Sequence, residues 1–424
     1  MDNITHSLIG VALGKSVFRR EEPRIQRAAI WTAVIGSNLP DLDILISAMT
    51  GGTKISYLLH HRGWTHTILF AVPGAFFAAW LGAKLARQPK GKPPIWKRML
   101  PLAFISVLLH LLADYANNYG IHPFAPFESR WYYGDTLFIV EPAVWLAMLP
   151  LLFMRLRSWT FRILSLLFYG AVLALIWNAP MVPQYLAYAL STWAAVFFLF
   201  QLFSKGPAPA WAGLFLTIAI FGSASHLAKA RMRQEHKALA PFEVLKDVVL
   251  TPAPGNPLCW NALVVSQILD ERYIVRNAGL SFWPEVASPD TCYFRMQNLR
   301  TAPWKPTSLV LGSSGPAIPA KNGVVWIGDY RGTISEALEL KKRYCAFDQF
   351  LRFSRVPYWN VGERTGIAGD LRYDFEPELG FAEFELKEND PQCLTFPPHW
   401  TPPRAFLPPI QTIPQRGENT DVAR

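Results

Sequence analysis

Long stretches of this sequence contain no Asp, Glu, Lys or Arg. Of its 424 residues, the ranges 64–83, 163–204 and 206–228 carry none of these four types. A surface helix of a soluble protein exposes a charged or polar face, whereas a membrane-spanning helix needs about 20 mostly apolar residues. Because 51% of the chain is also hydrophobic, these uncharged ranges indicate a membrane protein.

The apolar segments predict seven to eight hydrophobic helices. The range 163–204 is long enough for two crossings, with 178–183 as the turn between them. Weaker spans that contain carboxylates are expected at 28–49, 99–119 and 137–154. The predicted fold class is a multi-span α-helical membrane domain, residues 1–238, followed by a small extramembrane α+β domain, residues 239–424.

The N-terminus lacks the basic residues that precede the apolar core of a secretory signal peptide. Its positive cluster, which includes Lys15, follows the apolar segment instead. We therefore expect a first helix that starts outside the cell membrane and ends inside. Its roughly 16 apolar residues are short for a complete crossing.

Basic residues are scarce in every second connector. Fifteen Lys and Arg occupy the ranges 15–27, 84–98 and 155–162 together with Lys205, whereas the opposite connectors carry only Lys54, Arg62 and Arg130. The positive-inside rule makes the first set cytoplasmic. The net charge of +10 thus reflects membrane topology. Since no basic stripe with interleaved aromatics occurs, no nucleic-acid partner is expected.

Beyond residue 228 the composition changes to charges of both signs, with Pro and Gly between short alternating segments. Two strands around an Asp-Glu-Arg turn are predicted in 259–283 and another strand in 323–330. A helix in 335–353 that runs into a further strand and a hairpin in 369–387 complete the domain. The Pro-rich tail from Pro397 is expected to be extended or loose.

Cysteine is absent from the predicted membrane domain, and all four cysteines lie in the second domain at Cys259, Cys292, Cys345 and Cys393. If this domain lies outside the membrane, an even count is compatible with two disulfides in three possible pairings. Four unpaired thiols are the equal alternative. A thiolate metal site in the membrane domain is not expected.

Histidines and carboxylates in the membrane domain gather in five short stretches. An ionisable group within a membrane span costs several kcal/mol unless it is paired, hydrated or coordinated. The predicted topology brings all five stretches to the outer face, which indicates one common site. The stretches contain His6, then Asp41 and Asp43, then His60, His61 and His66, then His110 and Asp114, and finally Asp135 and Glu141.

The residue types in these stretches are typical of a divalent metal site. Imidazole nitrogen with carboxylate oxygen suits Zn²⁺ first, with Mn²⁺ or Fe²⁺ as alternatives. His110 and Asp114 are four residues apart and would share one face of a helix. Asp41 and Asp43 follow Pro40, where an irregular backbone could turn both toward one centre. One or two ions are possible, and a pair would suit phosphoester hydrolysis.

Several of these groups also have structural interpretations. His60 is expected to be an interfacial histidine, Arg62 either contacts lipid headgroups or binds a substrate phosphate, and Asp43 could orient other groups while Asp41 binds the metal. Structural roles are expected for four further sites: an interfacial His226, a solvated His236 and His399, and a cross-strand pair of Asp370 with Arg372.

The same stretches, in this order, resemble the family of LexA-regulated, inner-membrane-associated, metal-dependent hydrolases of bacteria. The resemblance rests on MDNITHSLIG, GSNLPDLDIL, HHRGWTHTILF, HLLADYANNYG, HPFAPFESRWYYGDTLFIVEP, TPAPGNPLCW and GDLRYDF. It implies a metal site drawn from His6, Asp41, His61, His66, His110 and Asp114, with Asp43, Asp135 and Glu141 as nearby candidates. Where this chain has Glu141, the family tends to have Asp.

The function expected from these features is metal-dependent hydrolysis of a phosphoester or lipid-linked substrate at the outer face of the bacterial inner membrane. Asp114 or Asp43 would accept a proton, and Arg62 would hold a phosphate of a membrane lipid or other amphipathic substrate. An intramembrane metalloprotease is disfavoured because the chain has no His-Glu-x-x-His. A metal-stabilised scaffold or a transporter remains the alternative of a different class.

Overall fold

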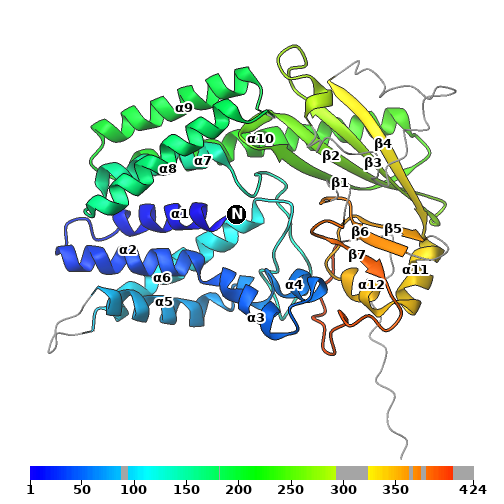
Figure 1. The fold of residues 1–424 in the computed structure, drawn as a ribbon, viewed down its shortest axis with the longest axis horizontal. Helices are drawn as coiled ribbons and strands as arrows, with labels where there is room; N and C mark the ends of the chain where they lie inside the picture. The colour runs from blue at the N-terminus through cyan, green and yellow to red at the C-terminus, as the bar shows by residue number, and fades with distance from the viewer. Residues whose placement is uncertain (87–93, 181, 293–322, 362–365, 374–378, 404–424) are drawn as a thin grey trace, which may run out of the picture.

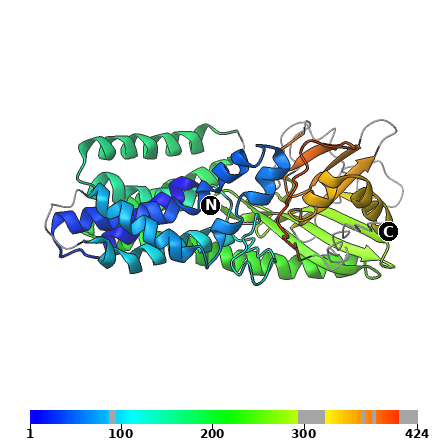
Figure 2. The ribbon, with the colours of Figure 1, turned by 90° about the horizontal axis from the view of Figure 1, so that it is seen from below.

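The computed structural model describes residues 1–86, 94–180, 182–292, 323–361, 366–373 and 379–403. A bundle of helices forms one end of an elongated molecule, and two β-sheets with short helices form the other (Figures 1 and 2). The predicted fold class, a helical membrane domain followed by a small α+β domain, is confirmed.

The helical part follows the apolar segments of the sequence. Its elements are α1 (Asn3–Ser16), α2 (Pro23–Asn38), η1 (Pro40–Asp43), α3 (Ile44–Met49), α4 (Lys54–His60), η2 (Trp64–His66), α5 (Ala71–Leu85), α6 (Trp96–Tyr115), α7 (Pro142–Arg155), α8 (Trp159–Asn178), α9 (Gln184–Phe203) and α10 (Ala208–Leu239). Four of the described helices, α6, α8, α9 and α10, are long and apolar enough to cross a membrane.

Two of the expected spans are broken. The span predicted over 28–49 is interrupted after Asn38, where Pro40 starts the 3₁₀ turn η1, and its two parts meet at 46°. The span predicted from Trp64 becomes α-helical only at Ala71, and the segment before it is bent by 79° relative to α5. If each bent pair counts as one span, up to six of the described segments are long and apolar enough to cross a membrane.

Small residues allow α1 and α2 to pack closely. A Cβ added at Gly10 would lie 2.8 Å from the Cα of Val34, and one at Gly14 would lie 2.6 Å from the Cα of Ile30. These two glycines are four residues apart and so share one face of α1. Backbone contact between α1 and α2 therefore fixes the position of α1, which carries His6.

The C-terminal part contains two antiparallel sheets. The first has the order β1 (Val244–Ala253), β2 (Asn256–Ile268), β3 (Arg272–Ser281) and β4 (Val324–Thr333), and the second has the order β5 (Pro357–Val361), β6 (Gly366–Asp370) and β7 (Glu383–Leu386). Its short helices are η3 (Pro289–Thr291), α11 (Ile334–Arg343) and α12 (Cys345–Phe350).

The sequence predicted most of these elements. β2 and β3 form the expected pair around the predicted turn, and β6 pairs with β7 as the expected hairpin. The single helix expected over 335–353 is two helices, because Tyr344 leaves the helical conformation between α11 and α12. β5 is the further strand expected after this helix, and β1 was not predicted. Of the Pro-rich tail, residues 404–424 lie outside the described part.

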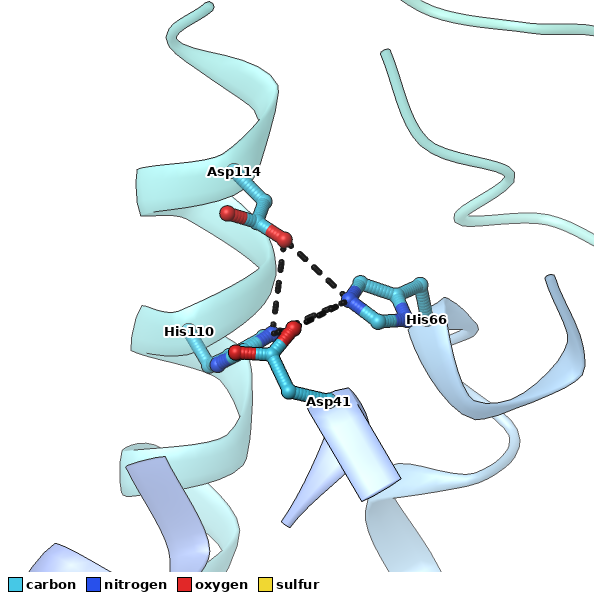
Figure 3. A group of neighbouring side chains, drawn as sticks. All are labelled: Asp41, His66, His110 and Asp114. Carbon is cyan, nitrogen blue, oxygen red and sulfur yellow. Dashed lines mark hydrogen bonds and ion pairs between the residues drawn. The ribbon is translucent and has the colours of Figure 1, made fainter. Parts of the chain in front are cut away.

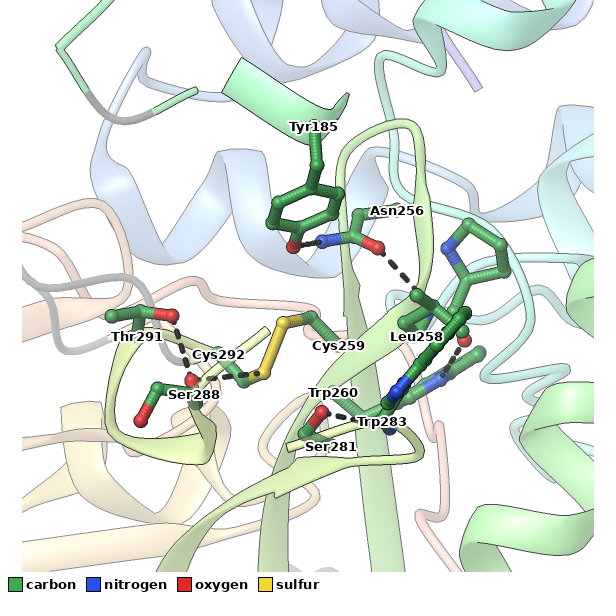
Figure 4. Close-up of a disulfide and its surroundings, with 11 residues drawn as sticks. Tyr185, Asn256, Leu258, Cys259, Trp260, Ser281, Trp283, Ser288, Thr291 and Cys292 are labelled. Carbon is green, nitrogen blue, oxygen red and sulfur yellow. Dashed lines mark hydrogen bonds between the residues drawn. A yellow bond between two sulfur atoms is a disulfide. The ribbon is translucent and has the colours of Figure 1, made fainter. Parts of the chain in front are cut away.

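The cysteines pair in sequence order, as Cys259–Cys292 and Cys345–Cys393. The interpretation as four unpaired thiols is therefore wrong. The first disulfide lies beside the start of β2, where Asn256 donates a hydrogen bond of 2.7 Å to the hydroxyl of Tyr185 on α9 (Figure 4). This contact joins the first sheet to the helical part.

Buried charges connect the two parts elsewhere. Asp135, in the segment between α6 and α7, forms ion pairs with Lys229 of α10 at 2.9 Å and Arg355 at 2.8 Å. Burial would raise the pKa of Asp135, but these two cations hold it below its ordinary value. Arg355 also pairs with Asp247 of β1 at 2.8 Å. One arginine thus links the second sheet region, the first sheet and the membrane domain.

Two of the structural interpretations differ in detail. Asp370 and Arg372 are paired at 2.9 Å, but within one turn after β6 and not across two strands. His236 was expected to be solvated, yet it is buried in the last turns of α10. His226 and His399 are exposed.

Candidate metal centre

Four side chains from three separate segments meet in a buried group: Asp41, His66, His110 and Asp114 (Figure 3). Each offers one ligand atom, and these atoms all lie within 4.8 Å of one another. None of the four residues is more than 8% exposed. A buried group of two imidazoles and two carboxylates could hold a divalent metal ion.

The spacing of the ligand atoms fits a small tetrahedral ion. Nε2 of His66 lies 3.0 Å from Nε2 of His110 and 3.1 Å from Oδ2 of Asp114. Oδ1 of Asp41 lies 3.5 Å from Nε2 of His66 and 3.6 Å from Nε2 of His110. A tetrahedral zinc site with bonds of about 2.0–2.1 Å has ligand-to-ligand distances of about 3.3–3.4 Å. The chemistry and spacing of these donors therefore fit Zn²⁺.

Hydrogen bonds orient both imidazoles with Nε2 toward the centre of the group. Nδ1 of His110 lies 2.7 Å from the carbonyl of Ser37, and Nδ1 of His66 lies 3.2 Å from Oδ2 of Asp43. A carbonyl and a carboxylate can only accept, so each Nδ1 carries the proton and each Nε2 keeps its lone pair. Such outer contacts are typical of histidines that bind metals.

The second oxygens of the two carboxylates are also occupied. Oδ2 of Asp41 accepts a hydrogen bond of 2.9 Å from Asn3. Oδ1 of Asp114 contacts Nε2 of His6 at 3.2 Å, the guanidinium of Arg62 at 3.0 Å and the amino group of Met1. Because cations already surround this oxygen, the geometry favours one ion between the four residues over a second ion beside His6.

Local structure explains how distant residues converge. Asp41 and Asp43 turn inward because Pro40 replaces a helical turn by η1, whose aspartates are both buried. His66 lies on the short turn η2, and the spacing of four residues places His110 and Asp114 on one face of α6. His6 lies on α1 and stacks on the ring of His110 with centroids 3.9 Å apart.

His61 lies beside the four-residue group rather than in it. Its Nδ1 is 3.0 Å from Oδ1 of Asp43, so Asp43 contacts both His61 and His66. Since the carboxylate accepts the Nδ1 proton, Nε2 of His61 presents a lone pair. The ring stacks on Tyr57 at 5.0 Å and remains partly accessible, with 13% of its side chain exposed. The arrangement suits a proton acceptor oriented by a carboxylate.

Arg62 is buried between the metal group and the C-terminal part. Its guanidinium contacts Asp114 and donates a hydrogen bond of 2.9 Å to the side-chain oxygen of Asn117. The guanidinium carbon lies 4.8 Å from the centre of the Tyr119 ring. Its Nε has no hydrogen-bond partner among the described residues. The same holds for the buried hydroxyls of Tyr119 and Tyr373, whose rings lie 6.1 Å apart.

Three of the candidate residues lie away from the group. His60 bonds through Nδ1 to the carbonyl of Ser56 at 2.9 Å. Asp135 belongs to the ion pairs with Lys229 and Arg355 described above. Glu141 caps the start of α7, where it accepts a hydrogen bond of 3.1 Å from the amide of Ala143, and burial raises its pKa to about 8.

The residues that support Arg62 were not among those predicted from the sequence. His122 donates from Nδ1 to the carbonyl of Arg62 at 3.0 Å, and burial lowers the pKa of His122 to about 3. The centre of its ring lies 3.8 Å from the ring centre of Trp131 and 3.9 Å from that of Trp400. Trp400 also donates 2.7 Å to the carbonyl of Leu59. In the sequence, His122 follows the HLLADYANNYG stretch closely, and this position could have indicated a role near the metal group.

Comparison with known proteins agrees with the membrane assignment. Over 141 residues, which are 31% of this chain and 39% of the relative, the sequence is 27% identical to the uncharacterized protein YfhP of Bacillus subtilis (strain 168). The chain thus matches well under two thirds of that relative. No solved structure matches significantly. Residues 1–182 match the YdjM inner membrane protein family, the LexA-regulated family expected above, and with the apolar helices this match indicates a multi-pass inner membrane protein.

Proposed function

We propose that this protein is a metal-dependent hydrolase of a phosphoester in a lipid or other amphipathic substrate. The observation that carries the proposal is the buried group of Asp41, His66, His110 and Asp114 with Arg62 beside it. A scaffold needs the four ligands alone. The oriented base at His61 and the unpartnered Arg62 Nε have no role in a scaffold, so they favour the enzyme.

Each residue has a distinct part in the proposed reaction. A metal ion held by the four residues would have to take a fifth ligand, as zinc can during a reaction, and it would then polarise the phosphoryl oxygen and lower the pKa of a water. His61, oriented by Asp43, would take the proton of the attacking water at Nε2. The expectation that Asp43 itself accepts this proton is replaced, because its two oxygens face His61 and His66. Arg62 would hold the phosphate through Nε.

Exposed apolar side chains beside the ligands support an amphipathic substrate. α3 follows directly after Asp43, and it exposes Leu45 and Met49, which are 60% and 84% accessible. Helix α3 belongs to a bent pair with α2, so these side chains lie next to a membrane-spanning segment. A lipid tail in the bilayer could lie against α3 while its phosphoester reaches the buried ligands.

The test measures bound metal and hydrolysis on protein purified in detergent. We expect about one Zn²⁺ per chain in the wild type, measured by elemental mass spectrometry, and its loss in His66→Ala and Asp114→Ala. His60→Ala is the matched control, because this histidine lies outside the group and should leave metal binding unchanged. Wild-type protein without metal, or equal loss in the control, would contradict the site.

A second variant distinguishes the hydrolase hypothesis from the scaffold hypothesis. His61→Ala should keep the metal but lower hydrolysis of a phosphodiester or phospholipid panel by about 10²–10⁴-fold, the usual contribution of a general base. If the wild type binds metal and hydrolyses no member of the panel, the scaffold or transporter is the better interpretation.

We also propose that the site and the C-terminal part face the outside of the inner membrane. The two disulfides support this orientation, because disulfides persist outside the reducing cytoplasm. A membrane-impermeant maleimide should label Leu269→Cys in the exposed β2–β3 turn on intact cells. Lys84→Cys, at the other end of the bundle, should react only after permeabilisation. The reverse labelling pattern would establish the opposite orientation.

A further inference from the structure

A basic cavity lies at the end of the helical part opposite the metal centre. It has a volume of about 200 Å³ and lies between the end of α1, the start of α2, the end of α7 and the connection from α9 to α10. One water needs only about 10–15 Å³, so the cavity has room for a polyatomic anion. Lys15, which lines it, is nine residues after His6, or about 14 Å further along α1.

The lining of this cavity is positively charged. It includes Lys15 at the end of α1, Arg19 in the α1–α2 connector, Arg155 at the end of α7 and Lys205 in the α9–α10 connection, and it includes no carboxylate. In the α1–α2 connector, Glu21 is paired with Arg98 at 2.8 Å, and Glu22 does not line the cavity. Four cations around one space repel one another unless an anion lies among them.

The cations keep free donors. Lys15 uses one bond, of 2.8 Å, to the carbonyl of Arg155. Arg155 donates through Nη2 to the carbonyls of Gln201, Leu202 and Ser204, while its buried Nε has no partner among the described residues. The side chains of Arg19 and Lys205 form no ion pair within the described ranges.

The loop between α9 and α10 is shaped to admit Arg19. A Cβ at Gly206 would lie 3.0 Å from the guanidinium carbon of Arg19, so the glycine leaves room for this side chain in its present position. Leu202 and Phe203 precede the loop and are 51% and 83% exposed. Basic groups next to exposed apolar side chains at a helix end match a headgroup with its acyl chains.

We propose that this cavity binds the phosphate group of an anionic phospholipid on the side of the membrane opposite the metal centre. The ligand chemistry is a phosphate oxyanion held by Lys15, Arg19, Arg155 and Lys205, with the acyl chains against Leu202 and Phe203. A free phosphate ion would offer the same oxygens without the chains. The proposal does not depend on the hydrolase activity.

The experiment titrates the purified full chain in neutral detergent and follows its unfolding temperature. One series adds phosphatidylglycerol, a second adds phosphatidylcholine and a third adds inorganic phosphate. The test variant is Arg19→Gln/Lys205→Gln, because both side chains are exposed and neither forms an ion pair. Arg155 is avoided, since its hydrogen bonds to the end of α9 are structural. The control is Lys84→Gln/Lys97→Gln, which removes two exposed charges from the same end of the bundle outside the cavity.

We expect saturable stabilisation by phosphatidylglycerol alone, with a half-saturating concentration about tenfold higher in the test variant and within about twofold in the control. Native mass spectrometry should show the lipid retained by the wild type and the control. Equal behaviour of both variants, or equal stabilisation by phosphatidylcholine, would overturn the proposal. Stabilisation by inorganic phosphate that the test variant loses would support the oxyanion site with free phosphate as its ligand.

Discussion

At the scale of single residues, Arg62 has an unusual backbone conformation close to the metal group. Its backbone has a φ of 59°, in the left-handed region that residues with a side chain seldom adopt. Its amide donates a hydrogen bond of 2.7 Å to Oδ2 of Asp43, and its carbonyl accepts a hydrogen bond from His122. These two bonds hold the backbone in a conformation that aims the guanidinium at Asp114.

Removing the donor at His122 should therefore release Arg62. In His122→Phe the ring still fills the space between Trp131 and Trp400, but the carbonyl of Arg62 is left buried without a donor. We expect a loss of about 1–3 kcal/mol in stability and a larger fall in hydrolysis than in metal binding. Thermal unfolding and metal content measure the two effects. His226→Phe, at an exposed histidine of α10, is the control, and an equal loss in it would contradict this role.

Glu141 should make stability depend on pH. Burial raises its pKa to about 8, so the folded protein binds a proton that the unfolded chain releases above a pKa of about 4.5. This contribution is complete at pH below about 4.5 and decreases as the pH rises toward 8. Glu141→Gln should flatten this decrease when unfolding temperatures are compared at pH 5, 7 and 9. A parallel pH profile for both proteins would show that Glu141 does not titrate in this range.

At the scale of elements, the metal group forms where two apolar segments are interrupted. Pro40 ends α2 so that Asp41 and Asp43 face inward, and the bend before α5 brings His66 beside α6. The sequence predicted the irregular backbone after Pro40 and the shared face of His110 and Asp114, because proline and a spacing of four residues act locally. It did not predict that His61 lies outside the group, since the bend of 79° depends on tertiary contacts.

Close packing of α1 on α2 gives a test at this scale. Gly14→Ala places a Cβ 2.6 Å from the Cα of Ile30, so α1 must shift and move His6 away from Asp114. We expect destabilisation of about 1–3 kcal/mol and weaker metal binding. Gly170→Ala on α8 is the matched control, because nothing lies within 4 Å of its Cβ. It should be neutral or stabilising by up to about 1 kcal/mol, and equal losses would contradict the packing argument.

At the scale of the whole molecule, the C-terminal part closes over the metal-binding end of the helices. Lys54 donates to the carbonyls of Gly380 and Glu383 at 2.8 Å, and Arg372 donates to the carbonyl of Asn118. Composition predicted two parts and the class of each, because apolar length and strand alternation are local properties. The contacts between the parts join residues hundreds of positions apart, which no local pattern encodes.

The two disulfides should differ in their effect on the site. Each closes a loop, of 48 residues for Cys345–Cys393 and 33 for Cys259–Cys292, so each should contribute about 3–4 kcal/mol of stability. Only the Cys345–Cys393 disulfide holds the segment that leads to Trp400. Cys345→Ser/Cys393→Ser should therefore also lower hydrolysis, whereas Cys259→Ser/Cys292→Ser should lower the unfolding temperature alone. Thermal unfolding and hydrolysis assays separate the two, and equal loss of hydrolysis in both would argue against this difference.

The hydrogen bond from Trp400 to the carbonyl of Leu59 spans 341 positions of the chain. During synthesis the N-terminal helices leave the ribosome and enter the membrane long before residue 400 is made. The loop that carries His61 and His66 therefore lacks this cover until Trp400 has been made. A chain that stops before Trp400 would hold every residue of the metal group but would lack the bond that covers this loop.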